Sequence, residues 1–332
     1  MNKRVLIVDD ELNLLRSLQR NLRGKFDLTM AEGGVAGMTQ ILEAGPFAAI
    51  VSDLRMPEID GLQVLGLARL VVPDTFRVML TGNVSSHLSL QGSISQPWFQ
   101  YVSKPCTTES LCTVLNEGTD RYAMASSARR PHSLTTTENS LTTTESGSPQ
   151  ISGTSREAVE RCRRLRELAR RLGDFLNLNE TWQYELAGML SQLSRLVPVA
   201  VSEQREQNND HDEVNLRNQA ESSSRIIREI PRLEQIADMV GHQYTEEFEP
   251  TVPDCIRKGT QILRMLMDFD VLAETFSEVE AIDKMKERSE WYGEPLFFSF
   301  SELISEEPRR RSNVPFHPHK LEAFRVSCSI TK

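Results

Sequence analysis

The stretch AAIVSDLRMPEIDG, residues 48–61 of a 332-residue chain, decides the fold of the N-terminal part. It opens with an apolar run of strand length that ends in Asp53. Similar runs of four or five residues recur before and after it, and segments with leucines at helical spacing separate them. The runs occupy residues 5–8, 28–31, 48–52, 76–80 and 99–103. Apolar strands that alternate with helices form a parallel sheet with both faces covered, so residues 1–123 are predicted to be an α/β domain.

Polar residues stand at the carboxyl ends of four of these predicted strands. They are Asp9, Asp10, Asp53, Thr81 and Lys104. The carboxyl ends of parallel strands meet at one edge of a sheet, which is where ligands bind. Clustered carboxylates repel one another and suit a hard cation such as Mg²⁺. An aspartate can also accept a phosphoryl group, whose oxygens a lysine and a hydroxyl can then neutralise and bind.

These residues resemble a two-component receiver domain. The motifs VLIVDDE, SDLRMPEIDG, MLTG and VSKP follow one another at residues 5–11, 52–61, 79–82 and 102–105. The resemblance covers residues 3–120 and implies a flavodoxin-like, doubly wound sheet of five parallel strands. It also implies that Asp53 accepts a phosphoryl group from a histidine kinase. Asp10 and Asp53 would ligate Mg²⁺ with the Arg55 backbone carbonyl, and Asp9 would do so through water.

The same resemblance assigns the other conspicuous residues around the sheet edge. Thr81 and Lys104 would bind the phosphoryl oxygens, and Tyr101 would be the aromatic residue that rotates on phosphorylation. Pro57 and Gly61 would shape the loop after Asp53.

The composition changes after the first domain. Residues 124–154 are rich in Ser and Thr and contain a tandem repeat, SLTTTEN then SLTTTES, at 133–146. Such a segment buries too little apolar surface to offset its ordering entropy, so it is predicted to be a flexible linker. Residues 155–304 return to helical spacing and are predicted to form an all-helical domain of six or seven helices. Residues 305–332 are expected to be a loosely ordered tail.

The helical part resembles an HD-type phosphohydrolase of the HD-GYP branch. The similar stretches are LNETWQYELAGMLSQLSRLVP, IIREIPRLEQIADMVGHQ and LRMLMDFDVL, at residues 178–198, 226–243 and 263–272. A receiver followed by such a domain is an arrangement of cyclic di-GMP phosphodiesterases, which use two or three metals bound by His and Asp.

The metal ligands of that family are largely replaced in this sequence. Ser191 and Gln192 stand where the defining His-Asp pair should fall, and His242-Gln243 replaces a His-His pair. Another position at which the family has a histidine falls near Asn218 in this sequence. His242 and Asp268 are interpreted as remnants, so no confident metal site and no catalytic residue are assigned to this domain. His211-Asp212 is a literal His-Asp doublet, but it lies in a polar stretch with no apolar face to hold ligands.

Bulk composition excludes several classes of protein. The net charge of −9 and the lack of a helix-turn-helix signature argue against direct DNA binding. Five scattered cysteines without a C-x-x-C pair indicate a reducing compartment and no disulfide framework. No signal peptide core or membrane-length apolar run is present, so a cytoplasmic protein is expected.

Three hypotheses follow. The first is a response regulator that is phosphorylated on Asp53 by a sensor histidine kinase or phosphotransfer protein. It signals through a non-catalytic HD-like domain by binding an unknown protein or by forming a homodimer through the receiver. The second is a receiver-controlled cyclic di-GMP phosphodiesterase, which would need metal ligands not identified in the sequence. The third is a scaffold whose receiver is never phosphorylated.

Overall fold

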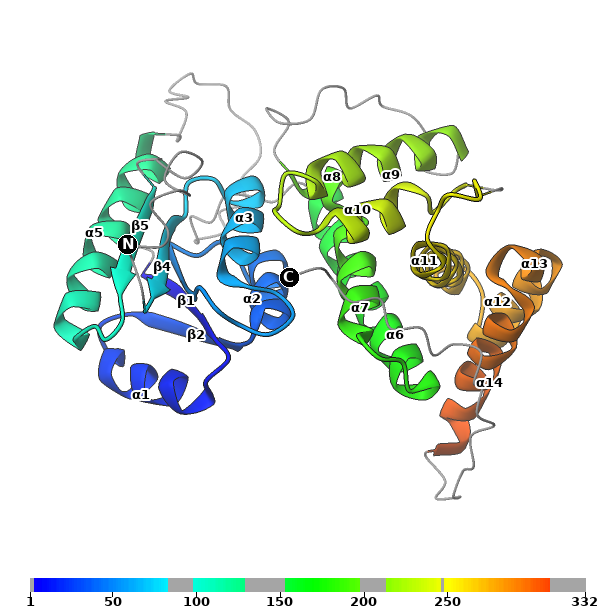
Figure 1. Ribbon diagram of the computed structural model, residues 1–332, viewed down its shortest axis with the longest axis horizontal. Coiled ribbons are helices and arrows are strands. Elements are labelled where there is room, and N and C mark those ends of the chain that lie inside the picture. The colour runs from blue at the N-terminus through cyan, green and yellow to red at the C-terminus, as the bar shows by residue number, and fades with distance from the viewer. Residues whose placement is uncertain (1–2, 83–97, 129–152, 198–212, 246–247, 311–332) are drawn as a thin grey trace, which may run out of the picture. The chain divides into compact units, whose positions relative to one another are not determined.

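The computed structural model describes residues 3–82, 98–128, 153–197, 213–245 and 248–310. It divides into two compact units, Met1–Arg156 and Glu157–Lys332, and each is described by itself (Figure 1). Most of the predicted linker and tail, the His211-Asp212 doublet and residues 83–97 lie outside the described residues.

The N-terminal unit is built on a five-stranded parallel sheet. Its strands pair in the order β2-β1-β3-β4-β5. They are β1 (Arg4–Asp9), β2 (Asp27–Glu32), β3 (Ala49–Asp53), β4 (Phe76–Thr81) and β5 (Phe99–Ser103). Each predicted apolar run is confirmed as a strand to within one residue at either end. The central strands are buried on both faces, which is why they read as continuous apolar runs rather than as alternating ones.

Helices cover both faces of this sheet, so the doubly wound fold class is confirmed (Figure 1). The described helices are α1 (Leu12–Leu22), α2 (Gly34–Glu43), α3 (Gly61–Val71) and α5 (Thr108–Ala128). Side chains alternate along a strand. Val5 and Ile7 pack in one core with the apolar sides of α1 and α5. Val8 faces α2, where a β-carbon on Gly37 would come within 2.7 Å of it, so only glycine lets this helix approach so closely.

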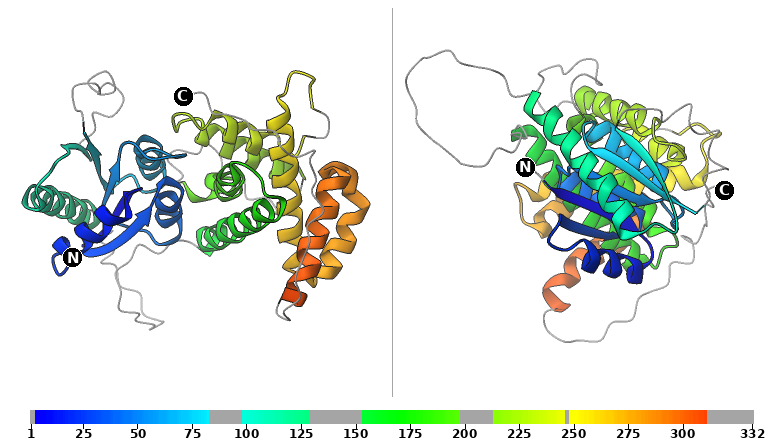
Figure 2. Two further views of the ribbon diagram at one scale, coloured as in Figure 1. Left: turned by 60° about the horizontal axis from the view of Figure 1, so that its bottom comes forward. Right: turned by 90° about the vertical axis from the view of Figure 1, so that its left-hand side faces the viewer.

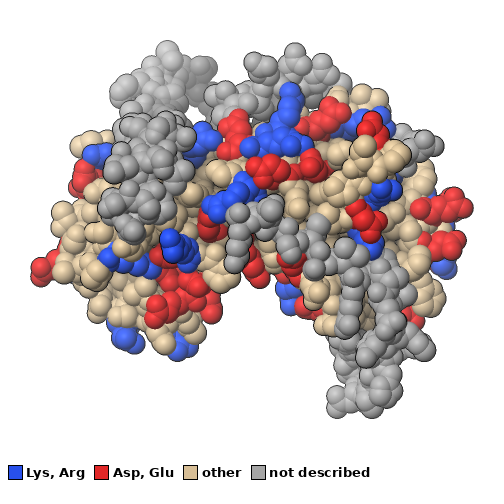
Figure 3. Space-filling view, viewed as in Figure 1, with Lys and Arg blue, Asp and Glu red and all other residues tan. Residues whose placement is uncertain are grey.

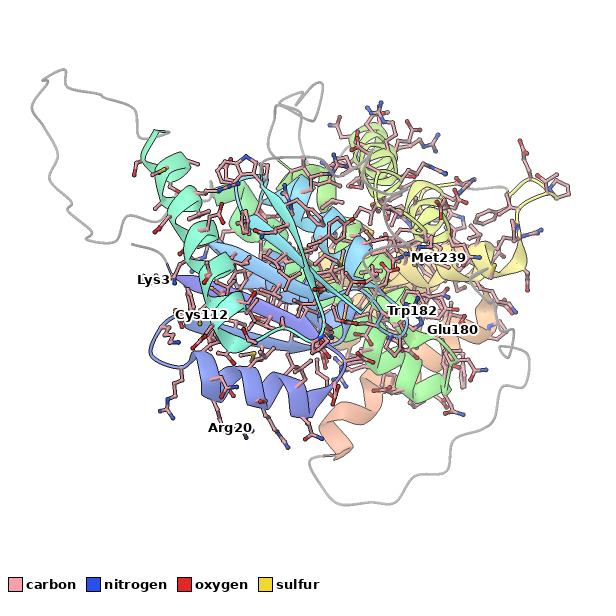
Figure 4. The ribbon with its side chains drawn as sticks, turned by 60° about the vertical axis from the view of Figure 1, so that its left-hand side comes forward. Lys3, Arg20, Cys112, Glu180, Trp182 and Met239 are labelled. Atoms are coloured by element: carbon pink, nitrogen blue, oxygen red, sulfur yellow. The ribbon has the colours of Figure 1, made fainter. Side chains whose placement is uncertain are left out.

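The second unit is helical throughout its described residues, as the sequence predicts (Figure 2). Its helices are α6 (Gly153–Leu176), α7 (Thr181–Leu190), α8 (Leu193–Leu196), α9 (Glu213–Ile227), α10 (Glu234–Gly241), α11 (Asp254–Ala273), α12 (Glu278–Met285), the 3₁₀ turn η2 (Lys286–Arg288), α13 (Ser289–Tyr292) and α14 (Glu294–Arg310). Helix α11 contacts α7, α10, α12 and α13. Gly259 of α11 lies so close to Met239 of α10, which Figure 4 labels, that a β-carbon there would come within 2.5 Å of the sulfur.

The element count and two boundaries differ from the predictions. The described residues of this unit contain nine α-helices, whereas six or seven are predicted. The additional ones include α8 and α13, which have four residues each and are too short to give a periodic signal. Helix α5 continues to Ala128, past the predicted domain end at residue 123, and α14 continues to Arg310, past residue 304.

The cysteines depart from the prediction in one respect. Cys106, Cys112 and Cys162 are free thiols, whereas Cys255 is disulfide-bonded. A lack of C-x-x-C spacing excludes a local pair but not a bridge between distant residues.

Two surface properties bear on the partners that the chain could have. No helix among the described residues has the length and apolar character needed to cross a membrane. Acidic and basic side chains are mixed over the face shown in Figure 3, and its described part shows no broad surface of a single sign.

Candidate functional site

The carboxyl edge of the sheet collects the residues that the sequence singles out. Strands β1, β3 and β4 are neighbours and end in Asp9, Asp53 and Thr81, respectively. β5 lies beside β4 and leads directly into Lys104. All three strand-end side chains are buried, Asp9 and Thr81 almost completely. The predicted convergence at this edge is therefore seen in the structure.

Lys104 lies between two buried carboxylates. Its Nζ atom is 2.9 Å from Asp9 Oδ2 and 2.5 Å from Asp53 Oδ1. Burial alone would lower the pKa of Lys104, but hydrogen bonds to Asp53 and Asp9 and their negative charges raise it above its ordinary value. The ammonium is therefore held in its charged form and offsets the repulsion between the two carboxylates.

Backbone groups hold the same two carboxylates in place. The Glu11 amide donates a hydrogen bond to Asp9 Oδ1 at 2.9 Å, and the Arg55 amide donates one to Asp53 Oδ2 at 2.8 Å. Lys104 is positioned by its own amide, which donates to the Thr81 carbonyl at 2.7 Å. Each carboxylate is thus fixed by one neutral donor and by the shared ammonium.

The loop after Asp53 requires glycine where the chain enters α3. A β-carbon on Gly61 would come within 2.1 Å of the Asp53 carbonyl oxygen. Asp60 caps this helix, because its carboxylate accepts from the Gln63 amide while the Gln63 side chain accepts from the Asp60 amide. The sequence motif around Gly61 therefore has a steric cause.

The remaining predicted residues of this edge differ in exposure. Asp10 is exposed, whereas its neighbour Asp9 is buried. Tyr101 packs edge-on against Phe99, with ring centroids 4.8 Å apart. Its hydroxyl is buried and has no hydrogen-bond partner among the described residues. Burial raises the pKa of Tyr101 above its ordinary value.

The donors at this edge suit magnesium chemically. Asp9, Asp53 and the exposed Asp10 offer the hard oxygen ligands that Mg²⁺ prefers, and Lys104 shows that the two buried carboxylates already attract a cation. Among the described residues, no three His, Cys, Asp or Glu side chains are grouped so that they could hold a metal ion together.

In the helical unit, the two residues that replace the expected His-Asp pair are hydrogen-bonded within the helix packing. Ser191 and Gln192 are both buried at the end of α7. The Ser191 hydroxyl donates to the Gly188 carbonyl at 2.8 Å and accepts from the side-chain Nε2 atom of Gln192 at 3.1 Å. Ser223 of α9 donates to the Ser191 carbonyl at 2.9 Å. These hydrogen bonds tie α7 to α9, whereas the buried Gln192 Oε1 atom has no hydrogen-bond partner among the described residues.

The other predicted remnants also have structural partners. The His242 ring nitrogen Nδ1 lies 2.8 Å from the Asp238 carbonyl, one turn earlier in the chain. Asp268 accepts a hydrogen bond from the Tyr292 hydroxyl at 2.6 Å. Burial raises the pKa of Asp268, although this hydrogen bond opposes the shift. Asn218 lies exposed on α9.

Sequence reasoning missed a buried ion-pair cluster in this unit. Asp270 of α11 is almost fully buried and pairs with two arginines of α6. Arg164 binds it through two nitrogens, at 2.6 and 3.0 Å, and Arg161 Nε is 3.2 Å from it. Asp270 is one of two aspartates in the helical stretch at 263–272, and the arginine-rich sequence of α6 was the only signal for its partners.

Family comparisons agree with this division of the chain. Residues 5–116 match the model of the response regulator receiver domain, and residues 146–296 match the model of the HD domain.

Curated relatives match part of the chain. The hydrogenase transcriptional regulatory protein HoxA of Bradyrhizobium diazoefficiens is 29% identical over 120 residues, which are 36% of this chain and 24% of that protein. The transcriptional regulatory protein GlrR of Escherichia coli is 27% identical over 136 residues, 40% of this chain and 30% of that protein. The chain thus spans less than a third of the length of these two relatives.

Solved structures match over a similar share of the chain. An adenylate cyclase structure from Rhodopirellula baltica is 33% identical and covers 39% of this chain and 95% of its own, with a TM-score of 0.36. The signal receiver domain of an HD domain-containing protein from Pseudomonas fluorescens is 23% identical and covers 39% and 93%, with a TM-score of 0.35.

Proposed function

Because the chain joins a response regulator receiver domain to an HD domain, we propose that it is a phosphorelay protein whose chemistry occurs on Asp53 alone. A sensor histidine kinase or a phosphotransfer protein donates the phosphoryl group. The HD domain then transmits the signal by binding a partner protein and hydrolyses no phosphodiester.

The observation that carries this proposal is the bridge from Lys104 to Asp9 and Asp53. An aspartate oxygen that attacks phosphorus must have its charge offset during approach, and the phosphoryl oxygens need a fixed cation afterwards. Lys104 is positioned to be the fixed cation for the phosphoryl oxygens. The Asp53 carboxylate is buried but lies at the sheet edge, where ligands of such folds bind.

Other residues of the edge have supporting roles. Asp9, Asp10, Asp53 and the Arg55 carbonyl would hold Mg²⁺, which when bound neutralises the carboxylates and the incoming phosphoryl oxygens. The Thr81 hydroxyl would bind a phosphoryl oxygen. Tyr101 would rotate toward the sheet edge as Thr81 binds the phosphoryl group, because no described residue hydrogen-bonds its hydroxyl in the present position.

The non-catalytic part of the proposal rests on the hydrogen bonds of the helical unit. The Gln192 side-chain amide donates a hydrogen bond to the Ser191 hydroxyl, and neither of these neutral groups is a strong metal ligand. Asp268 is held by Tyr292. A hydrolytic two-metal centre would have to break these contacts and recruit further ligands.

The experiment is intact mass spectrometry of the full chain after incubation with acetyl phosphate and Mg²⁺. The wild type should gain one phosphoryl group, and Asp53→Asn should gain none. Removing Mg²⁺ with EDTA should abolish the gain in the wild type. Equal labelling of wild type and Asp53→Asn, or no labelling of either, would refute Asp53 as the acceptor.

A further inference from the structure

The segment from Phe276 to Phe298, which runs from just before α12 into α14, exposes an unusual number of apolar side chains. Seven large hydrophobic residues are exposed among the described residues, and four of them fall between residues 276 and 298. Phe276 and Trp291 are partly covered by cations, with Lys284 Nζ 4.3 Å from the Phe276 ring centroid. Val279 of α12 and Phe298 of α14 are 63% and 64% exposed. Single exposed residues are ordinary, but such a concentration is typical of a binding surface.

Acidic residues accompany these apolar ones. Residues 274–294 hold seven carboxylates and three basic side chains, and all seven carboxylates are exposed. Four of them have no ion-pair partner within the described part of the chain. We call these four the acidic face: Glu278, Glu287, Glu290 and Glu294. Helices α12 and α14 pack side by side (Figures 1 and 2). A ligand for this surface should therefore combine positive charge with apolar side chains.

The chain itself contains such a segment directly after α14. Residues 311–332 read RSNVPFHPHKLEAFRVSCSITK and hold four Lys or Arg residues against one Glu. Apolar side chains are interleaved with these charges, among them Phe316, Leu321 and Phe324. The segment starts where α14 ends, at Arg310. Its 22 residues would reach about 33 Å even as a helix, which exceeds the ~26 Å length of α14.

We propose that residues 311–332 bind back onto the acidic face and the exposed apolar side chains between Phe276 and Phe298. Charge complementarity orients the segment. Covalent attachment to α14 supplies a high effective concentration, so a weak contact suffices. The bound segment removes the exposed apolar side chains from water. It competes with any partner protein that uses the same surface.

The test is limited trypsin digestion of the full chain with dithiothreitol present, so that no disulfide holds the segment. Trypsin cleaves after Lys320 and Arg325, and mass spectrometry follows the released peptides. Both sites should be cut at least about tenfold more slowly than in a synthetic peptide of residues 311–332. Cleavage as fast as in the free peptide would overturn the proposal without the need for any variant.

Variants locate the contact. Glu287→Gln with Glu290→Gln should speed cleavage at Lys320 about fivefold, because exposed ion pairs contribute up to ~1 kcal/mol each. The matched control is Glu109→Gln with Asp120→Asn on α5, which should leave the rate unchanged. Equal rates in both variants would overturn the assigned surface. Protection that grows with protein concentration would show that a second copy occupies the surface, and would overturn the intramolecular contact.

Discussion

The two units use buried charge in opposite ways. At the sheet edge of the receiver, Lys104 reaches between two carboxylates, and Asp10 remains exposed beside them. In the helical unit, Asp270 is enclosed by Arg161 and Arg164 and lies within the helix packing. The first arrangement can exchange partners when a ligand arrives at the edge, whereas the second joins α6 to α11. Buried charge therefore indicates a reactive site only where a ligand can approach it.

The largest expected effect follows from disrupting the ion-pair cluster around Asp270. Asp270→Asn replaces the buried carboxylate by a neutral amide, so Arg161 and Arg164 lose this anionic partner. Loss of one partner of a buried ion pair costs about 3–5 kcal/mol. The free energy of unfolding of the helical unit, measured in urea, should fall by roughly that amount. Asp174→Asn, which removes an exposed partner of Arg170, is the control and should change it by less than about 1 kcal/mol. Similar losses in both variants would contradict the structural role of Asp270.

The next effect concerns the proposed phosphorylation site. Lys104→Ala removes the ammonium group that contacts both Asp9 and Asp53. The rate of phosphoryl uptake from acetyl phosphate should fall roughly 100-fold or more, as when one fixed electrostatic donor is removed from an active site. Lys25→Ala is the control for the loss of a lysine, because Lys25 lies just before β2, at the opposite edge of the parallel sheet. A normal uptake rate in Lys104→Ala would show that the bridge has no role in the chemistry.

A smaller effect tests the loop that follows Asp53. Gly61→Ala puts a β-carbon against the Asp53 carbonyl oxygen, so the loop must shift. Overpacking of this kind costs about 1–3 kcal/mol, and the receiver should lose that much stability in urea. Gly82→Ala is the matched control, because a β-carbon there meets nothing within 4 Å. Unchanged stability in Gly61→Ala would mean that the loop adapts freely.

The smallest effect is a pH dependence in the helical unit. Burial raises the pKa of Asp268 in the folded chain, so the folded state holds this proton more tightly than the unfolded state does. The contribution of Asp268 to stability is therefore fully present at pH below its ordinary pKa, and is lost as pH rises through the raised value. Asp268→Asn should flatten this part of the profile of unfolding free energy against pH. An unchanged profile would contradict the shift.

The sequence predicts the cluster at the sheet edge better than the ion-pair cluster of the helical unit, and the reason is geometric. Asp9, Asp53 and Lys104 each follow an apolar run, and the topology of a parallel sheet brings such residues to one edge. No comparable rule joins Asp268 to Tyr292, or Asp270 to arginines more than 100 residues earlier. Those contacts depend on the crossing of helices whose relative placement is not encoded in local periodicity. Short helices such as α13, which carries Tyr292, leave no periodic signal either.

The most direct test of this division measures both units in one sample. Full-length protein is treated with acetyl phosphate and Mg²⁺, and Mn²⁺ is added to supply the HD domain. Intact mass then reports the phosphoryl gain, and chromatography reports the hydrolysis of cyclic di-GMP. The account predicts one phosphoryl group, located on Asp53 by peptide mapping, and no hydrolysis above buffer. Hydrolysis that Asp268→Ala abolishes would contradict it, because the helical unit would then contain a working metal centre.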